Sequence, residues 1–329
     1  MHRVSLFSNP ACALHDPGPD HSDQPGRLAA LAAAVRADAE LWRRIDERLA
    51  PPVLEEDLLR VHDAGHVHRV REHVAALHRG QHAWLDPDTA VAPGSWEAAL
   101  AAAGCACSAV EAVLDGAATS AFALSRPPGH HATADRAMGF CLFNNVAVAV
   151  RRLQAQRRVG RVLVVDWDAH HANGTQALFY GDPDVYVLSL HLHPHYPGTG
   201  EADERGEGAG LGATQNVPLA AGTAGEEYRR LFLEALDRAR SSFSPELVVV
   251  SAGFDCLEGD PEGGLGLRPA DLHRLSADLI ERVPAAAAGR LVGVLEGGYA
   301  LERIGAGLAN VLRAFARMPP AGPAAGESQ

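Results

Sequence analysis

Lysine is absent from the sequence, so all 29 basic residues are arginines. They are outnumbered by 41 acidic residues, which gives a formal net charge of −12. A chain of this charge with no basic cluster is poorly suited to the phosphate backbone, so we expect no nucleic-acid partner. The same charge favours small cations as partners, because an acidic surface attracts them over long distances.

Cysteines are few, and long apolar runs are missing. The five cysteines form no CxxC pair, which predicts reduced, mostly buried thiols rather than disulfides or a cysteine-based zinc site. No apolar run reaches the ~18 residues of a membrane span, and the N-terminus lacks the apolar stretch of a signal peptide. We therefore expect a cytoplasmic protein with no membrane contact.

Short β-branched runs alternate with longer helical patterns along the chain. This alternation predicts an α/β fold with a parallel sheet covered by helices on both faces. No linker interrupts it, so we expect one domain over residues 1–318, a disordered tail over 319–329 and a long functional loop over 191–222. The predicted strands are 3–7, 121–124, 161–165, 185–190, 246–251 and 291–295. The predicted helices are 26–49, 64–80, 94–115, 140–157, 224–242, 269–283 and 301–317.

Polar residues gather where five of the predicted strands end. Ligands of doubly wound sheets bind beyond the carboxyl ends of the strands, so these segments predict one convergent site. The segments are SRPPGHH (125–131), DWDAHHANGT (166–175), HLHPHYPGTG (191–200), AGFDCLEGDPEGG (252–264) and EGGYA (296–300).

Three residues of these segments have the pattern of metal ligands. Asp168 and His170 stand two positions apart just past a strand, so in extended chain their side chains project the same way. Asp255 can add a third ligand from a neighbouring strand. Two carboxylates and one imidazole suit Zn²⁺ or Fe²⁺ and leave positions open for water and substrate. The alternative for Asp168 and His170 is a hydrogen bond that caps a helix start.

Two adjacent histidines, His130 and His131, can divide the proton work of a reaction if different partners tune them. Asp166 would hold one imidazole charged, and the amide of Asn173 would leave the other nearer neutral. Tyr299 could donate its hydroxyl to a developing oxyanion. Together with a metal, these groups describe the hydrolysis of a carbonyl compound.

As a set, the residues resemble the arginase/deacetylase fold and, within it, the zinc-dependent histone deacetylases of class II type. The resemblance spans about residues 15–315 in the family's order and implies a sheet of about eight strands. The matching motifs are RPPGHHA (126–132), MGFCLFNNVA (138–147), VDWDAHHANGT (165–175), YPGTG (196–200), NVPL (216–219), SAGFD (251–255), GDP (259–261) and LEGGY (295–299).

The resemblance implies a role for each residue of the site. It implies that His131 acts as general base and then general acid, and that His130 with Asp166 acts mainly as an electrostatic element. Tyr299 would polarise the acyl oxygen, and Asp88 at the rim would orient the substrate. The implied Zn²⁺ ligands are Asp168, His170 and Asp255. The implied channel residues are Gly139, Phe140 and Tyr196. The implied site for a structural K⁺ comprises Asp166, Asp168, His170, Ser189 and Leu190.

Some positions depart from the family pattern. Ala172 replaces a common glycine, which is tolerated unless its φ is positive. Ala300 replaces a common asparagine, a change that we expect to be mild. His195 stands beside Tyr196 where an apolar or aromatic residue is common, and it predicts a more polar channel mouth. The stretch 16–28 does not clearly match the helical insertion that narrows the entrance in the polyamine branch.

Glu262 is the departure that bears on the substrate. It replaces the leucine of a common GDPLGG pattern, and the branch of the family that prefers acetylated polyamines carries glutamate there. A carboxylate at the rim attracts a second ammonium group of the substrate. At ~4 Å such a pair is worth about 1–4 kcal/mol for effective dielectric constants of about 80 to 20. We therefore expect an amidohydrolase that acts on acetylated polyamines such as acetylspermidine.

Three other functions compete with this prediction. The same enzyme could act on acetyl-lysine in proteins. An arginase-type ureohydrolase would need a second metal, yet Ala172 and Cys256-Leu257 stand where further carboxylates would be required. A non-catalytic acetyl-ligand binder is disfavoured because the whole catalytic set is present.

Overall fold

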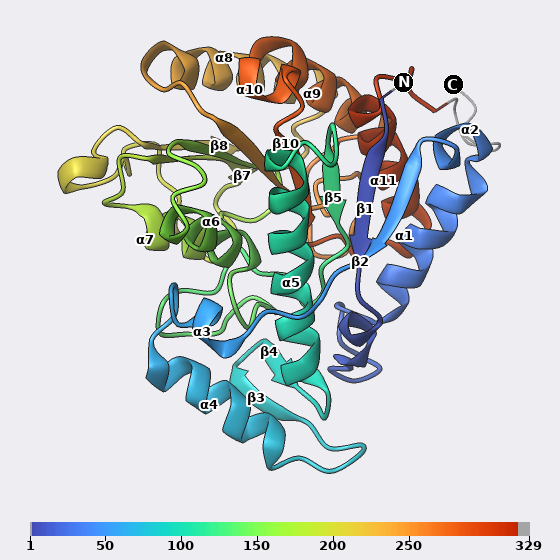
Figure 1. The fold of residues 1–329 in the computed structure, drawn as a ribbon, viewed down its shortest axis with the longest axis vertical. Coiled ribbons are helices and arrows are strands. Elements are labelled where there is room, and N and C mark those ends of the chain that lie inside the picture. The colour runs from blue at the N-terminus through green and yellow to red at the C-terminus, as the bar shows by residue number, and fades with distance from the viewer. Residues whose placement is uncertain (1, 322–329) are drawn as a thin grey trace.

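The structure, a computed structural model, describes residues 2–321. Eight strands form one parallel sheet in the order β2-β1-β5-β10-β9-β6-β7-β8, and β3 and β4 form a separate antiparallel ribbon. The predicted α/β fold is therefore confirmed (Figure 1). The strands are β1 Val4–Ser8, β2 Ile45–Leu49, β3 Ala83–Asp86, β4 Thr89–Val91, β5 Ala121–Ala123, β6 Val162–Asp166, β7 Val185–Leu192, β8 Thr214–Leu219, β9 Leu247–Ala252 and β10 Leu291–Leu295.

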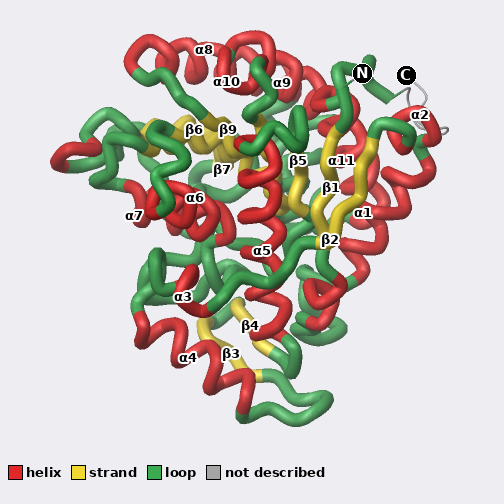
Figure 2. Tube along the Cα trace, in the orientation of Figure 1, coloured by secondary structure: helices red, strands yellow, loops and turns green. Residues whose placement is uncertain are grey.

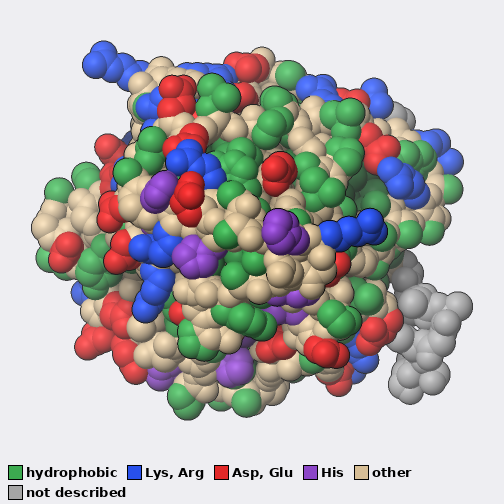
Figure 3. Space-filling view, turned by 90° about the horizontal axis from the view of Figure 1, so that it is seen from below, with side chains coloured by type: hydrophobic (Ala, Val, Ile, Leu, Met, Phe, Trp, Pro, Cys, Tyr) green, Lys and Arg blue, Asp and Glu red, His purple; other side chains and the backbone are tan. Residues whose placement is uncertain are grey.

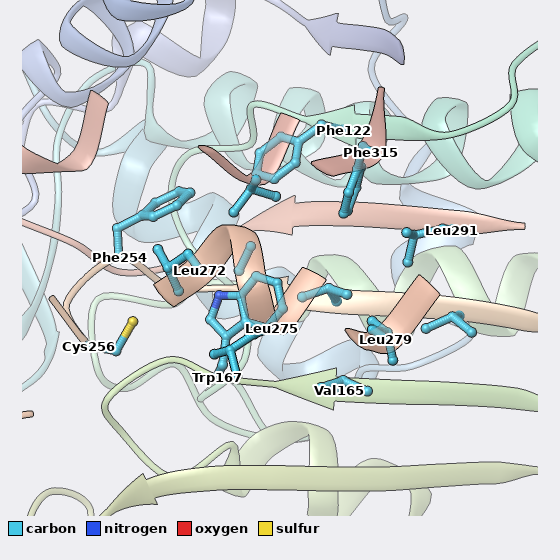
Figure 4. Packing of buried hydrophobic residues seen from close by; sticks show 14 of the residues in the cluster. Phe122, Val165, Trp167, Phe254, Cys256, Leu272, Leu275, Leu279, Leu291 and Phe315 are labelled. Carbon is cyan, nitrogen blue, oxygen red and sulfur yellow. The ribbon is translucent and has the colours of Figure 1, made fainter. Parts of the chain in front are cut away.

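Helices cover both faces of this sheet. In β6, Val162 and Val164 belong to one core cluster while Leu163 and Val165 belong to the other, because side chains alternate along a strand. The core that includes Val165, Trp167 and Leu275 is shown in Figure 4. The helices are α1 Gly26–Ala37, α2 Ala39–Trp42, α3 Glu55–Leu58, α4 Ala64–Ala75, α5 Ser95–Leu114, α6 Asn145–Ala155, α7 Asn173–Phe179, α8 Gly225–Ser242, α9 Pro269–Arg282, α10 Pro284–Ala287 and α11 Leu301–Phe315.

Two predicted segments were wrong in part. The predicted helix 26–49 is divided, because Asp38 ends α1 and caps α2 by accepting the N–H of Leu41 at 3.1 Å. The chain then turns and adds β2 as an edge strand beside β1. The predicted irregular segment 191–222 contains β8, which pairs with β7 at the other edge of the sheet. β2 and β8 are the edge strands of the main sheet, and polar residues interrupt the apolar pattern of both. They are Asp46, Glu47 and Arg48 in β2 and the buried Thr214, Gln215 and Asn216 in β8.

Helix α5 contradicts the expectation that nothing resembles a membrane span. Its length and apolar composition are sufficient for one to cross a bilayer. Most of the helix is nevertheless buried inside the protein, against β1, β5 and α6. The alanines that make it apolar also let it pack closely, as Ala102 and Ala106 show with no exposed surface. It is therefore a core helix by its packing.

The chain after α11 was expected to be disordered from residue 319. Residues 319–321 lie against α11, where Arg313 donates to the carbonyl of Pro319 at 3.2 Å and Ala321 donates to Asn310 at 3.1 Å. The remainder of the expected tail lies outside the described residues. Figure 2 shows that loops occupy much of the region between the main sheet and the β3–β4 ribbon.

Candidate metal and acid–base site

The site is assembled by neighbouring strands that end at the same level. Asp166, the last residue of β6, is in register with Ser251 of β9, and Ala252 of β9 is in register with Leu295 of β10. The loops after these three strands therefore begin side by side. This register brings together the segments that the sequence predicted to converge.

Three potential metal ligands meet at these loops. Asp168, His170 and Asp255 each offer an atom within 4.8 Å of the other two. His170 Nδ1 lies 3.0 Å from Asp168 Oδ1 and 3.4 Å from Asp255 Oδ2. Among residues 2–321 this is the one group of three or more potential ligands found. The arginase-type alternative, which requires a second metal ion, therefore gains no second group of ligands.

A metal ion fits this group of ligands. Asp255 Oδ2 is buried and has no hydrogen-bond partner within residues 2–321, although its other oxygen accepts the N–H of Ala169 at 2.7 Å. A buried carboxylate oxygen without a partner is costly, and a cation would satisfy it. Two carboxylates and an imidazole form a donor set suited to Zn²⁺.

Glycines enclose the carboxylates closely. A Cβ at Gly297 would lie 2.7 Å from Asp168 Oδ2 and closer still to Asp255 Oδ2, and a Cβ at Gly253 would also clash with Asp168. The N–H of Gly297 donates to Asp168 Oδ2 at 2.9 Å. Gly297, the first glycine of LEGGY after Glu296, thus allows the chain to pass directly behind the ligands.

The paired histidines have different partners. His130 Nδ1 lies 3.0 Å from Asp166 Oδ2, and His131 Nδ1 lies 2.7 Å from Asn173 Oδ1. Their ring centroids are 4.0 Å apart. This is the division of partners that the sequence predicted, one carboxylate and one amide.

These partners separate the two imidazoles electrostatically. Burial opposes a charge on His130, but the carboxylates of Asp168 and Asp166 outweigh it and raise the pKa of His130 to about 10. Burial, followed by the charges of His130 and His170, lowers the pKa of His131 well below its usual range. The pair can therefore hold one charged and one neutral ring.

Tyr299 is positioned through its backbone and its ring. Its N–H and that of Ala300 donate to Asp260 Oδ2 at 2.7 and 2.9 Å, so Asp260 of the GDP motif holds the backbone that presents Tyr299. The ring packs edge-on against Phe140, with centroids 5.6 Å apart, and the guanidinium of Arg27 lies 4.7 Å from its centroid.

The predicted channel residues lie beside His131. Gly139 and Phe140 both have positive φ, 56° and 65°, and a Cβ at Gly139 would lie 2.7 Å from His131 Cγ. Asp88 Oδ1 accepts the N–H of Gly139 at 2.9 Å, so the predicted rim aspartate holds the backbone of a predicted channel residue. Tyr196 crosses His131 edge-on with ring centroids 5.1 Å apart.

His195 and Glu262, which the sequence predicted at the channel entrance, lie beside each other. His195 stacks on His170 with centroids 5.1 Å apart, and its Nε2 lies 3.2 Å from the carbonyl oxygen of Glu262. The side chain of Glu262 is half-buried and accepts a hydrogen bond from the hydroxyl of Ser22. The 16–28 stretch thus reaches Glu262, although it contains no helix before Gly26. Figure 3 shows histidine and acidic side chains on the face of the molecule that carries the β3–β4 ribbon.

The departure at Ala172 is explained by its backbone. Its φ is −73°, a value that any residue adopts, so no glycine is required there. The predicted K⁺ residues are close together, because Ser189 of β7 is in register with Asp166, and Ser189 Oγ lies 3.5 Å from the N–H of Ala172. Leu190 follows on the same strand.

Sequence reasoning gave no role to several buried charged residues near the site. Asp23, Arg27 and Arg126 are completely buried, and Asp23 Oδ1 accepts from Arg27 at 2.6 Å and from Arg126 at 2.9 Å. Burial alone would raise the pKa of Asp23, but the two guanidiniums hold it well below its usual range. Glu296 is also buried, and its carboxylate accepts the N–H of His130 at 3.1 Å. Arg126 lies in the RPPGHHA motif and Glu296 in the LEGGY motif, and these places in the sequence could have indicated that both residues support the site.

Two histidines outside the site are packing residues. His62 and His66 are buried and pack against Phe143, with ring centroids 5.2 and 5.4 Å away. His62 Nδ1 lies 2.8 Å from the carbonyl of Thr133, and its Nε2 accepts the N–H of Asn144 at 3.0 Å. The five cysteines are free and buried, as expected.

The chain is similar to known proteins over most of its length. Residues 21–315 match the histone deacetylase domain. The histone deacetylase-like amidohydrolase of Pseudomonas aeruginosa is 40% identical over 318 residues, covering 90% of this chain and 82% of that protein. The human polyamine deacetylase HDAC10 is 38% identical over 307 residues, 91% of this chain but 44% of that longer protein. The crystal structure of the HDA15 HD domain matches with a TM-score of 0.90 at 34% identity, covering 98% of this chain and 90% of that one.

Proposed function

The chain belongs to the histone deacetylase family, whose members are hydrolytic deacetylases, and we propose that its substrates are acetylated polyamines such as acetylspermidine. One domain over residues 1–318 would carry the activity, in the cytoplasm. The reaction would release acetate and a free amine from the acetyl amide.

Glu262 is the observation that carries the choice of substrate. Its backbone carbonyl lies 3.2 Å from Nε2 of His195, which stacks on the ligand His170, and its half-buried carboxylate, which accepts a hydrogen bond from Ser22, would stand at the channel rim. A carboxylate there favours a substrate with a second ammonium group and disfavours the neutral backbone of a peptide. The net charge of −12 would attract such polycations, and a human relative is named a polyamine deacetylase.

Asp168, His170 and Asp255 would hold the metal, which is Zn²⁺ generally in this family, with Fe²⁺ as the other candidate. When bound, the ion supplies a Lewis acid that polarises the acetyl carbonyl and lowers the pKa of water. A structural K⁺ would be held by residues already placed together. These are Asp166, Asp168, His170, Ser189 and Leu190.

The acid–base steps fall to the paired histidines and the tyrosine. Neutral His131, oriented by Asn173, takes a proton from the attacking water and later returns one to the amine nitrogen as the amide bond breaks. His130, beside Asp166, keeps a positive charge near the reaction. Tyr299 donates its hydroxyl to the oxyanion that forms on the acetyl group.

The channel would hold the aliphatic part of the substrate. Gly139 and Phe140 form one wall beside His131, and Tyr196 forms another. Asp88 supports the first wall through the N–H of Gly139 and would also orient the amide of the substrate.

The test compares kcat/KM on acetylspermidine and on an acetyl-lysine peptide for the wild type, Glu262→Leu and the matched control Glu258→Leu. Glu258 is exposed in the same loop, so its replacement changes the charge equally without touching the rim. We expect the wild type to prefer acetylspermidine and Glu262→Leu to lose about tenfold of that preference. The control should keep it. A wild type that prefers the peptide would select the acetyl-lysine alternative, and an unchanged ratio in Glu262→Leu would remove Glu262 from substrate selection.

A further inference from the structure

Glu296 carries a carboxylate in the interior, next to the acid–base pair. It follows Leu295 at the end of β10 and has no exposed surface. Burying a carboxylate is unfavourable unless hydrogen bonds or charges compensate it. Within residues 2–321 no arginine forms an ion pair with its carboxylate, so the charge of His130 and a set of hydrogen-bond donors provide the compensation.

These donors belong mainly to the turn that presents the histidines. Glu296 Oε2 accepts the backbone N–H of Gly129 at 2.7 Å and that of His130 at 3.1 Å. Its Oε1 accepts the hydroxyl of Ser251 at 3.3 Å. Two peptide groups of the turn are therefore held by one oxygen, and hydrogen bonds to an ionised acceptor are stronger than those to a neutral one.

The turn is held from its other side as well. The N–H of Thr175 donates to the carbonyl of His130 at 3.0 Å, and Asn145 donates to the carbonyl of Pro127 at 3.0 Å. A Cβ at Gly129 would lie 2.9 Å from the carbonyl oxygen of Phe143, so the turn has little room to move. Glu296 is thus the sheet-side anchor of a turn that is closely packed elsewhere.

Glu296 is itself held in place through its main chain. Arg27 donates to the carbonyl oxygen of Glu296 at 2.5 Å and to that of Gly298 at 2.6 Å. Because the backbone of Glu296 is held in this way, its carboxylate can hold the turn in a defined position. Burial raises the pKa of Glu296 to about 7. The positive charge of His130 opposes that rise and so favours the ionised carboxylate.

We propose that Glu296 is a positioning residue for the acid–base pair. By holding the peptide groups of Gly129 and His130, its carboxylate sets where both imidazoles stand. It thereby fixes the 3.0 Å contact of His130 with Asp166 and the 2.7 Å contact of His131 with Asn173. Within residues 2–321 the hydrogen bonds of its carboxylate go to Gly129, His130 and Ser251 and not to the three metal ligands, so Glu296 acts through the turn.

The test uses the full-length, zinc-loaded enzyme and any acetylated amine that the wild type hydrolyses, so it is independent of polyamine preference. Glu296→Ala removes both acceptors, whereas Glu296→Gln keeps a carbonyl oxygen that can accept from the turn. The control Ser125→Ala removes a buried 3.0 Å hydrogen bond to Leu295, on the same strand end, without touching the turn. Thermal unfolding and zinc content are measured first for all variants.

We expect Glu296→Ala to lower kcat about 100-fold with KM within about threefold of wild type, because a displaced base costs rate more than binding. Glu296→Gln should recover kcat to within about tenfold of wild type, and Ser125→Ala should stay near wild type. The proposal is overturned if Glu296→Ala keeps kcat within twofold, or if Glu296→Gln is as impaired as Glu296→Ala. It is also overturned if Ser125→Ala loses as much. If Glu296→Ala does not fold, a folded Glu296→Gln whose kcat falls more than about tenfold below wild type overturns it as well.

Discussion

Replacing Gly297 by alanine should impair metal binding without any change to a ligand. The new Cβ would lie 2.7 Å from Asp168 Oδ2, whereas ordinary contact begins at 3.4 Å, so that oxygen must shift by about 0.7 Å. Asp255 Oδ2 is closer to the new atom and must shift further. Metal–ligand distances tolerate about 0.2 Å. We therefore expect zinc affinity to fall at least 100-fold, the upper end of what displaced supporting groups cost.

The measurement is zinc stoichiometry at equilibrium with a metal buffer, followed by deacetylase activity at saturating zinc. The matched control is Gly65→Ala in α4, where the residue is exposed and a Cβ would meet nothing within 4 Å. We expect the control to bind zinc as the wild type does and to gain about 0.4–1 kcal/mol of stability. Wild-type zinc affinity in Gly297→Ala would refute the view that this glycine makes room for the ligands.

Two further predictions concern catalysis and acid stability. Tyr299→Phe keeps the packing on Phe140 and Arg27 but loses the hydroxyl, so kcat should fall about 10²–10³-fold with thermal stability unchanged; activity within twofold of wild type would contradict the role of the phenol. Burial, and then the charge of His66, lowers the pKa of His62 to about 3. The contribution of neutral His62 to the free energy of unfolding is therefore fully present above about pH 6.5 and is lost as the pH falls towards 3. Between pH 7 and 5 this histidine should account for about 2 kcal/mol of lost unfolding free energy in urea titrations, and His62→Asn should show a correspondingly shallower loss; equal pH slopes would contradict it.

The central strands were predictable because they are buried on both faces and read as continuous apolar runs. Leu247–Ala252 and Val162–Asp166 are examples in which every residue is buried. The edge strand Ile45–Leu49 was missed because Ile45 is its one buried residue, and its charged members resemble a helix surface. Pairing with β1, a contact distant in sequence, decides its conformation.

The site was predictable to the extent that its residues follow strands directly. Asp168, His170 and Asp255 converge because parallel strands bring their ends together. The role proposed for Glu296 could not be predicted, because its hydrogen bonds to the backbone of Gly129 and His130 join segments that are distant in the sequence. The contact between Ser22 and Glu262 joins positions 240 residues apart and leaves no local pattern.

Asp260 connects the two ends of the proposed substrate channel. Its Oδ1 accepts the N–H of Glu262 at 3.1 Å, while its Oδ2 accepts the N–H of Tyr299 at 2.7 Å. One short side chain therefore holds the backbone of both the proposed oxyanion donor, Tyr299, and the proposed entrance carboxylate, Glu262. The separation between Tyr299 and Glu262 would therefore be fixed, and we expect it to select substrates by the number of methylenes between their amide and their next charge.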